Sequence, residues 1–171
     1  ITNFVLNELE KAHAKATFFC IGKNIANEPG LFKEILAAKH QIGNHTQNHA
    51  NGWKTSTVNY LQEIENCENA ILQHGYIHNG KALFRPPYGK ITRQQINAVK
   101  TKYRIMMWSI LAYDWLPEKN ENQCLKNVTS HLKNDAIIVM HDSVKAASNI
   151  KKTLPPLLQI IKDKGYDFGL I

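Results

Sequence analysis

The chain alternates short apolar runs with longer stretches of helical periodicity. Apolar side chains recur every three or four positions, as on one face of a helix, in six stretches: 2–12, 30–39, 57–73, 91–100, 120–132 and 157–163. Strand-like apolar runs lie between or after them, at 16–22, 41–42, 81–84, 103–111, 136–140 and 166–171. Strands that alternate with helices predict parallel pairing through helical crossovers, so we expect an α/β fold.

Polar residues gather where the predicted strands end. Four such groups follow strand-like runs: "HTQNH" (45–49), "RPPYG" (85–89), "AYDWLP" (112–117) and "HDS" (141–143). In barrel-type α/β folds the carboxyl ends of the strands meet at one face, and active sites form there. We therefore expect the four groups to share one site.

Length and charge narrow the function classes. A chain of 171 residues is long enough for one domain with a substantial core. Its net charge of +7 comes from scattered lysines without interleaved aromatic residues, which argues against nucleic-acid binding. No apolar run reaches the length of a membrane span. The three cysteines are too widely spaced for a disulfide framework or a metal-binding pair.

His45 and His49 are candidate metal ligands. Imidazoles four residues apart lie on one face of a helical turn, and neutral imidazole is a good zinc ligand. Catalytic zinc sites generally have three protein ligands, however, and this pair supplies two. From the residues alone, a polar loop explains the pair equally well.

Arg85 and Tyr88 form a second candidate group. Arginine stays protonated and can hold a carboxylate through two hydrogen bonds. The two prolines between these residues remove two amide donors and stiffen the loop, which leaves the N–H of Tyr88 to bind a ligand. A rigid turn with an exposed arginine is the alternative.

Asp114, Trp115 and His141 form the third candidate group. A histidine oriented by a carboxylate has the arrangement that general acid–base catalysis needs, and a tryptophan face suits a sugar. A hydrogen-bonded structural histidine is the alternative interpretation for His141.

Taken together, these groups resemble the polysaccharide deacetylase family, which shares the NodB homology domain and forms carbohydrate esterase family 4. That family has five ordered motifs: T-F-D-D-G, H-[ST]-x-x-H, R-x-P-[YF], D-x-x-D-W and L-x-H. The second and third are complete in "HTQNH" and "RPPY". The fourth is represented by "LAYDW", where Leu111 replaces the leading aspartate, and the fifth by "VMH". The resemblance spans essentially the whole chain.

The resemblance implies a distorted β/α barrel and metal-dependent removal of acetyl groups from N-acetylglucosamine. His45 and His49 would hold a divalent metal together with an upstream aspartate, and zinc is the ion that such ligands favour. Arg85 would orient the catalytic base. The remaining roles concern substrate and protons: the Tyr88 amide would stabilise the oxyanion, His141 with Asp114 would protonate the leaving amine, and Trp115, Val139 and Pro87 would contact the substrate.

The first motif, with its aspartate pair, has no counterpart in this chain. The family draws its catalytic base and third metal ligand from that pair. We favour an upstream truncation that also removes the first barrel strand, so that residues 1–171 form a single NodB-like domain cut at its N-terminus. We therefore expect this chain to bind zinc weakly or not at all and to show little activity. A chain extended upstream to include an aspartate pair should bind the metal and turn over substrate.

Two other readings stay open. In the first, the chain is a catalytically inactive carbohydrate-binding member of the same fold. In the second, it is a structural or partner-binding domain whose histidine pair is loosely occupied. For the enzyme we expect an acetylated glycan, such as chitin or peptidoglycan, as substrate, and action at the cell envelope. The sequence leaves the oligomeric state, the metal and the glycan undetermined.

Overall fold

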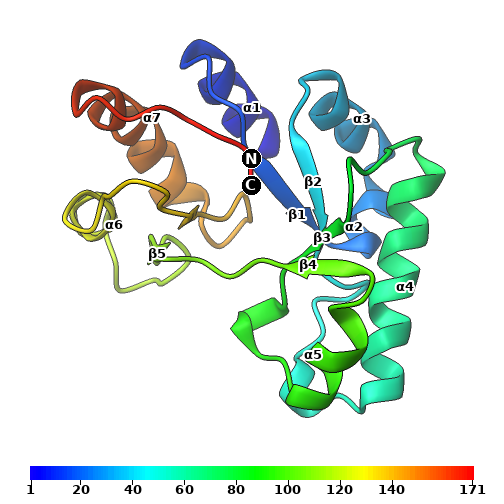
Figure 1. The fold of residues 1–171 in the computed structure, drawn as a ribbon. Coiled ribbons are helices and arrows are strands. Elements are labelled where there is room, and N and C mark those ends of the chain that lie inside the picture. The colour runs from blue at the N-terminus through cyan, green and yellow to red at the C-terminus, as the bar shows by residue number, and fades with distance from the viewer. The chain divides into compact units, whose positions relative to one another are not determined.

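The computed structural model describes all residues from Ile1 to Ile171, and these form two compact units. Unit 1 comprises residues 1–16 and 108–171, and unit 2 comprises residues 17–107 (Figure 1). Each unit has its own parallel sheet. Residues of the expected site are divided between the two units, so the geometry of each group is set by its own unit.

Unit 2 contains a four-stranded parallel sheet. Its strands lie in the order of the chain: β1 (Thr17–Cys20), β2 (Gln41–Asn44), β3 (Ala82–Phe84) and β4 (Tyr103–Ile105). The connections carry four helices and two 3₁₀ turns: α2 (Gly22–Asn27), α3 (Pro29–Ala37), η1 (Gly52–Lys54), α4 (Thr57–Gln73), η2 (Pro87–Gly89) and α5 (Arg93–Val99). Helical crossovers between neighbouring parallel strands confirm the expected α/β class.

Unit 1 contains a two-stranded parallel sheet and three helices. The strands are β5 (Ile110–Leu111) and β6 (Ile138–Val139), paired in parallel. The helices are α1 (Thr2–Lys11), α6 (Glu121–Thr129) and α7 (Ala147–Asp163). None of these or of the other helices has the length and apolar character needed to cross a membrane.

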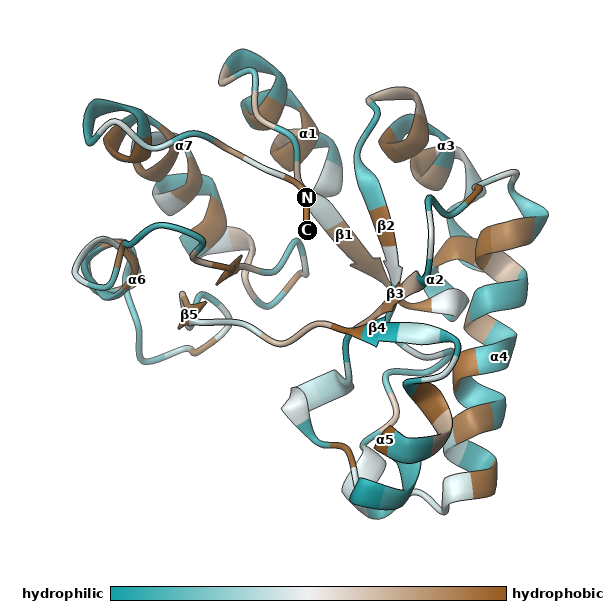
Figure 2. Ribbon diagram, in the orientation of Figure 1, coloured by the Kyte–Doolittle hydropathy of each residue, from teal (hydrophilic) through white to brown (hydrophobic).

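The core of unit 2 is built on the long helix α4. Its buried residues are spaced four, three and four apart, which places them along one helical face: Tyr60, Ile64, Cys67 and Ile71. Figure 2 shows apolar and polar positions alternating along this helix. Tyr60 and Ile64 pack with Phe84 of β3 and Val99 of α5, and this packing holds the end of β3, where Arg85 follows.

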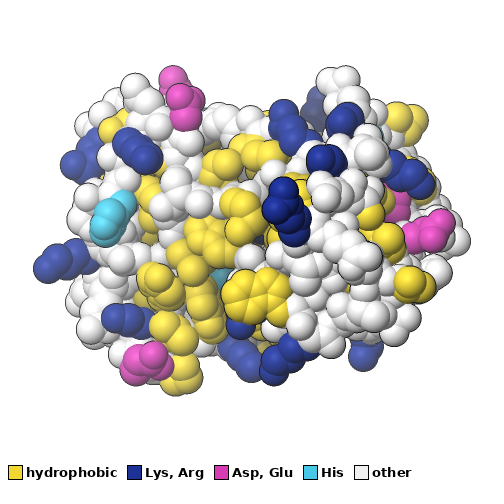
Figure 3. Space-filling view, turned by 60° about the horizontal axis from the view of Figure 1, so that its bottom comes forward, with side chains coloured by type: hydrophobic (Ala, Val, Ile, Leu, Met, Phe, Trp, Pro, Cys, Tyr) yellow, Lys and Arg dark blue, Asp and Glu magenta, His cyan; other side chains and the backbone are white.

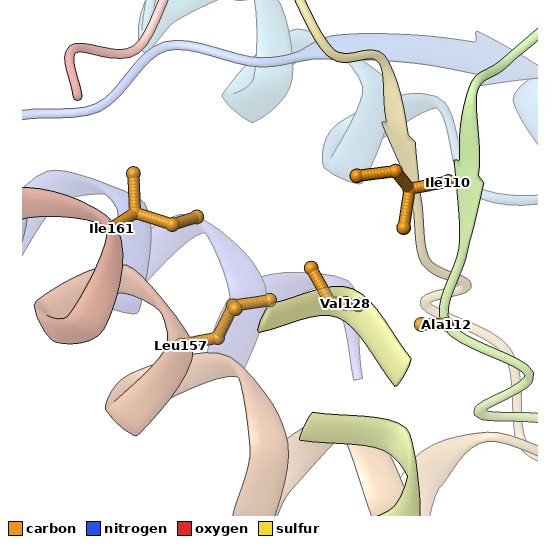
Figure 4. Packing of buried hydrophobic residues seen from close by; sticks show 5 residues of the cluster. All are labelled: Ile110, Ala112, Val128, Leu157 and Ile161. Atoms are coloured by element: carbon orange, nitrogen blue, oxygen red, sulfur yellow. The ribbon is translucent and has the colours of Figure 1, made fainter. Parts of the chain in front are cut away.

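The core of unit 1 joins both of its strands to two helices. Figure 4 shows its buried members, which come from β5 and the following residues, α6 and α7: Ile110, Ala112, Val128, Leu157 and Ile161. Tyr166 and Phe168 pack against this cluster. Ala112 is completely buried two residues before Asp114, so the core fixes the start of the loop that carries this carboxylate.

Two strand predictions were wrong in extent. The run 103–111 was expected to be one strand, but it forms β4 and β5, which belong to different sheets. Between them, the carbonyls of Met106 and Met107 accept hydrogen bonds from Arg85 instead of from a neighbouring strand. The closing run 166–171 is not a strand. Two of its aromatic side chains, Tyr166 and Phe168, pack against the core of unit 1 without ladder pairing.

The last helix is longer than its pattern predicted. We expected a helix over 157–163 after two prolines, whereas α7 begins at Ala147 and includes Pro155 and Pro156. Interior prolines remove amide donors and disfavour a helix. Here the helix also buries six side chains on one face: Ile150, Thr153, Leu154, Leu157, Leu158 and Ile161. This burial on both sides of the prolines outweighs their local cost.

Candidate active site

His45 and His49 lie side by side just beyond the end of β2. Their ring centroids are 4.9 Å apart in an edge-to-face arrangement. The Nδ1 atom of His45 is 2.7 Å from the carbonyl oxygen of Arg85. Since a carbonyl can only accept a hydrogen bond, Nδ1 of the neutral ring carries the proton and Nε2 carries the lone pair. This is the arrangement by which backbone groups orient metal-binding histidines.

The backbone of the histidine loop is in an unusual conformation. Thr46 and His49 have φ angles of 63° and 58°, in the left-handed region that residues other than glycine rarely adopt. The hydroxyl of Thr46 accepts a hydrogen bond of 2.8 Å from the amide of Ala50, which closes the loop. Such conformations persist where surrounding contacts impose them, and they concentrate at functional sites.

Asn44 is one of the residues that hold this loop, and its role was not predicted from the sequence. Its side chain is completely buried. Oδ1 accepts a 3.0 Å hydrogen bond from the Thr46 amide, while Nδ2 donates to the Ile64 carbonyl at 2.8 Å and to the Glu68 carboxylate at 3.0 Å. The signal in the sequence was a short amide residue at the end of a buried strand, immediately before His45.

Arg85 directly follows β3 and is only 8% exposed. Its Nε and Nη2 groups donate hydrogen bonds of 3.0 Å to the carbonyls of Met106 and Met107, and its guanidinium lies 4.0 Å from the ring centroid of Phe19. Burial lowers the pKa of Arg85 to about 10, so the side chain remains protonated at neutral pH. Arg85 therefore brings a fixed positive charge beside the histidine loop.

The position of Phe19 depends on a glycine in the next strand. Gly43 pairs with Phe19 in the sheet, and a Cβ at position 43 would lie 2.4 Å from the Phe19 ring. Cβ atoms essentially never make non-bonded contacts this short, so any larger residue at 43 would displace the ring. Gly43 thereby allows Phe19 to lie under Arg85.

Tyr88 lies in the 3₁₀ turn η2 with a φ angle of 61°. The amides of Gly89 and Lys90 make the turn hydrogen bonds, to the carbonyls of Pro86 and Pro87, and the Tyr88 amide is not among these donors. The Tyr88 ring is 60% exposed and lies 4.6 Å from the ring of His49, between centroids. The Tyr88 side chain thus contacts the histidine pair, while Pro87 is buried in the turn.

Asp114 and His141 form a hydrogen-bonded pair in unit 1. Asp114 is completely buried. Its Oδ1 atom is 2.9 Å from Nδ1 of His141, and its Oδ2 atom accepts a 2.6 Å hydrogen bond from the His141 amide. The Asp114 carbonyl accepts a further hydrogen bond from Asn149. The carboxylate therefore fixes both the backbone and the ring of His141, whose side chain is 39% exposed.

Aromatic residues surround this pair. The rings of Trp115 and His141 have centroids 4.6 Å apart, and Tyr113 lies 5.6 Å from Trp115. Tyr113 has a φ angle of 59°, a further left-handed residue beside a candidate catalytic group. Val139 is 8% exposed in β6, with its carbonyl bonded to the amide of Ala112.

Unit 1 also has an open hollow of about 400 Å³. Its walls come from the loop around Tyr113 and Leu116 and from helix α6, which contributes Lys126 and Asn127 among others. Neither Asp114 nor His141 lines this hollow, so it is a feature separate from the pair.

The structure thus assembles the expected residues in two groups. His45, His49, Arg85 and Tyr88 lie together in unit 2. In unit 1, Asp114, Trp115 and His141 are in direct contact. That the two groups form one site remains a prediction.

The donor set for a metal is partial. Histidine, cysteine, aspartate and glutamate side chains do not form any group of three or more that could hold a metal ion. His45 and His49 supply two nitrogen donors, with the outer contact to Arg85 that such ligands usually have. His45 and His49 could therefore fill two coordination positions of a metal ion. The other positions would be filled by groups other than the histidine, cysteine, aspartate and glutamate side chains of this chain.

Comparison with known proteins identifies relatives over the full length. The family model described as polysaccharide deacetylase matches residues 1–105. The peptidoglycan-N-acetylglucosamine deacetylase PgdA of Listeria monocytogenes is 33% identical over 173 residues, which cover 100% of this chain and 35% of PgdA. The chain therefore spans about a third of the length of this relative.

Solved structures share the fold. The Bc1960 peptidoglycan N-acetylglucosamine deacetylase, crystallised with a hydroxamate-type benzamide, superposes with a TM-score of 0.91 and 28% identity, over 99% of this chain and 79% of that one. BA3943 of Bacillus anthracis, described as a pseudoenzyme of carbohydrate esterase family 4, has a TM-score of 0.86 and 24% identity, over 99% and 58% of the two chains. These likenesses confirm the expected fold class, a distorted β/α barrel of the NodB type.

Proposed function

Because the chain belongs to the polysaccharide deacetylase family, we propose that it hydrolyses the N-acetyl groups of N-acetylglucosamine residues in a glycan. The observation that carries this proposal is the buried Asp114 bonded to both the ring and the amide of His141. A carboxylate that accepts from Nδ1 directs Nε2 of the ring outward, toward the space where a substrate would bind. A partly exposed imidazole held in this way is suited to proton transfer.

In this proposal His141 acts as the general acid. Amide hydrolysis needs a proton on the leaving nitrogen, since an amine anion is a very poor leaving group. The protonated ring donates from Nε2 while Asp114 stabilises its charge through the hydrogen bond at Nδ1. The Trp115 ring contacts His141. Together with Val139 and Pro87, Trp115 would shape the space for the acetyl group.

His45 and His49 are the proposed metal ligands. Deacetylases of this family are generally metal-dependent, and we propose zinc because two neutral imidazoles suit this ion. When bound, the metal would supply a polarised water and a Lewis acid for the acetamide oxygen. Arg85 keeps His45 oriented through its carbonyl, and its own charge would orient a carboxylate base.

The Tyr88 amide is the proposed oxyanion donor. A backbone N–H that makes no turn bond can donate to the oxygen that becomes negative in the tetrahedral intermediate. The left-handed conformation of Tyr88, supported by two flanking turn bonds, fixes the direction of this donor before substrate binds. Removing one such donor typically costs roughly 10²–10³ in kcat.

We further propose peptidoglycan as the substrate class and the cell envelope as the place of action. PgdA and Bc1960, the relatives described above, carry peptidoglycan N-acetylglucosamine in their names. Peptidoglycan lies outside the cytoplasm, so an enzyme acting on it would meet its substrate there.

Amine release from N-acetylglucosamine oligomers and from peptidoglycan tests the proposal. The assay compares the 171-residue chain with the chain plus whatever residues its gene places before Ile1, each with added zinc. We expect turnover in the second, and a loss of roughly 10²–10⁴ on His141→Ala. His131→Ala, an exposed histidine on the same unit, serves as the matched control. Turnover that survives His141→Ala would refute the assigned role.

A carbohydrate-binding protein without turnover is the second candidate. It is favoured by the lack of a three-residue metal-binding group in this chain. Binding of oligosaccharide without amine release, in every form of the protein and with zinc present, would establish this second function and reject the first.

A further inference from the structure

Unit 2 exposes a tryptophan and a lysine close to the histidine pair. Trp53, in the turn η1, is 66% exposed, although large aromatic residues are usually buried for most of their surface. The ammonium of Lys90 lies 5.1 Å from the centroid of the Trp53 ring. None of the ion pairs in the chain involves Lys90, so its charge is not matched by a carboxylate of the protein.

The tryptophan is exposed but firmly held. Its amide donates a hydrogen bond of 3.0 Å to Asn51 Oδ1, and its indole N–H donates to the Ile91 carbonyl at 3.4 Å. The buried side chain of Gln95 donates to the carbonyls of Gly52 and Thr55, on either side of Trp53. An aromatic surface that is ordered before a ligand arrives loses little entropy on binding.

The two chain segments around Trp53 and Lys90 are packed against each other. A Cβ at Gly52 would lie 2.4 Å from the Lys90 carbonyl oxygen, so the backbones approach as closely as glycine permits. The same two segments carry His49 and Tyr88, whose rings are in contact. Lys90 is two residues beyond Tyr88, and two Cα–Cα steps span at most about 7.6 Å. The Trp53–Lys90 pair therefore lies on the same two packed segments as part of the candidate site.

We propose that Trp53 and Lys90 form a substrate subsite that selects anionic glycans. The inference rests on the proposed deacetylation and names the substrate feature read by the same site. The sugar next to the one being deacetylated would pack its apolar face on the indole. Lys90 would then bind a carboxylate on the substrate. Stem peptides of peptidoglycan carry carboxylates, whereas chitin is neutral, so the subsite would distinguish these two polymers.

Binding measurements with two probes test the subsite. The probes are a tetramer of N-acetylglucosamine and a disaccharide-peptide fragment of peptidoglycan, titrated calorimetrically into the protein with any residues encoded before Ile1. Trp53→Ala should weaken both by roughly fivefold or more, as for a buried aromatic anchor, and Trp53→Phe should restore most of the affinity. Lys90→Gln should weaken only the peptide-bearing probe, by about 1.4- to 5-fold, and less at high salt.

Lys54→Gln is the matched control, because Lys54 is an exposed lysine in the same turn as Trp53. We expect it to leave both affinities unchanged. If Trp53→Ala leaves the affinity for both probes unchanged, the subsite is refuted. If Lys90→Gln lowers the affinity for both probes equally, the selection for anionic glycans is refuted. Thermal unfolding of each variant identifies any that fail to fold.

Amine release separates this inference from the proposed function. Binding that follows the expected variant pattern without release of amine from either probe would uphold the subsite and refute the deacetylation. Amine release with a kcat/KM that is insensitive to Trp53→Ala and Lys90→Gln would uphold the deacetylation and refute the subsite.

Discussion

Replacing Asn44 by alanine should strongly destabilise unit 2, because its side chain makes three hydrogen bonds in a completely buried position. The substitution leaves the buried Thr46 amide without its acceptor, whereas the Ile64 carbonyl, in the middle of α4, keeps its bond within the helix. An unsatisfied buried polar group costs about 1–3 kcal/mol. The Glu68 carboxylate also loses its bond from Asn44, but it retains its contact with His78, so this loss adds less to the cost. The one unsatisfied amide therefore gives a loss of about 1–3 kcal/mol, a substantial share of the roughly 5–15 kcal/mol that stabilises a typical protein.

Urea unfolding followed by circular dichroism measures this loss through the midpoint and slope of the transition. Asn69→Ala is the matched control, since Asn69 is an exposed asparagine on α4 of the same unit, and its effect should stay within about 0.5 kcal/mol. Glu68→Gln keeps an acceptor oxygen for Asn44 and should cost less than Asn44→Ala. A loss below about 1 kcal/mol for Asn44→Ala would mean that water replaces the missing partners, and the reasoning would fail.

Two further predictions concern the thiol in the core and the histidine pair. Burial raises the pKa of Cys67 to about 12, from an ordinary value of 9.0, so its stabilising effect is complete below pH 9 and is lost as the pH rises toward 12. Cys67→Ala should therefore flatten the fall in unfolding free energy between about pH 9 and 11; an unchanged slope would contradict this. In zinc titrations, His49→Ala should weaken binding by more than roughly tenfold, the effect of losing even an outer contact of a ligand, whereas His131→Ala should not. Equal affinities would show that zinc binds elsewhere.

Long-period patterns in the sequence predicted their elements well. Helix α4 occupies the residues that its apolar spacing indicated, 57–73, because one continuous face of the helix is buried. Short apolar runs were less informative. Residues 103–111 and 136–140 contain strands of only two or three residues, since apolar side chains near a strand can be buried without ladder pairing.

The candidate site was predictable where side-chain chemistry follows the family's motifs, as in His45 and His141. The residues that support it were not predictable, because their roles depend on contacts across the sequence. Asn44 reaches Ile64 and Glu68 on α4. Phe19 lies under Arg85 although it is 66 positions earlier in the chain, a contact that no local pattern encodes.

The close packing of Gly43 on Phe19 makes the evolution of this site depend on the order of mutations. A side chain at 43 is excluded while phenylalanine occupies 19, because the two would overlap. A smaller residue at 19 would first remove the ring on which Arg85 rests. Any path to a different pair must therefore pass through a variant in which the support of Arg85 is weakened. Libraries that vary one position at a time would find both sites intolerant, and those that vary 19 and 43 together would reach combinations closed to single steps.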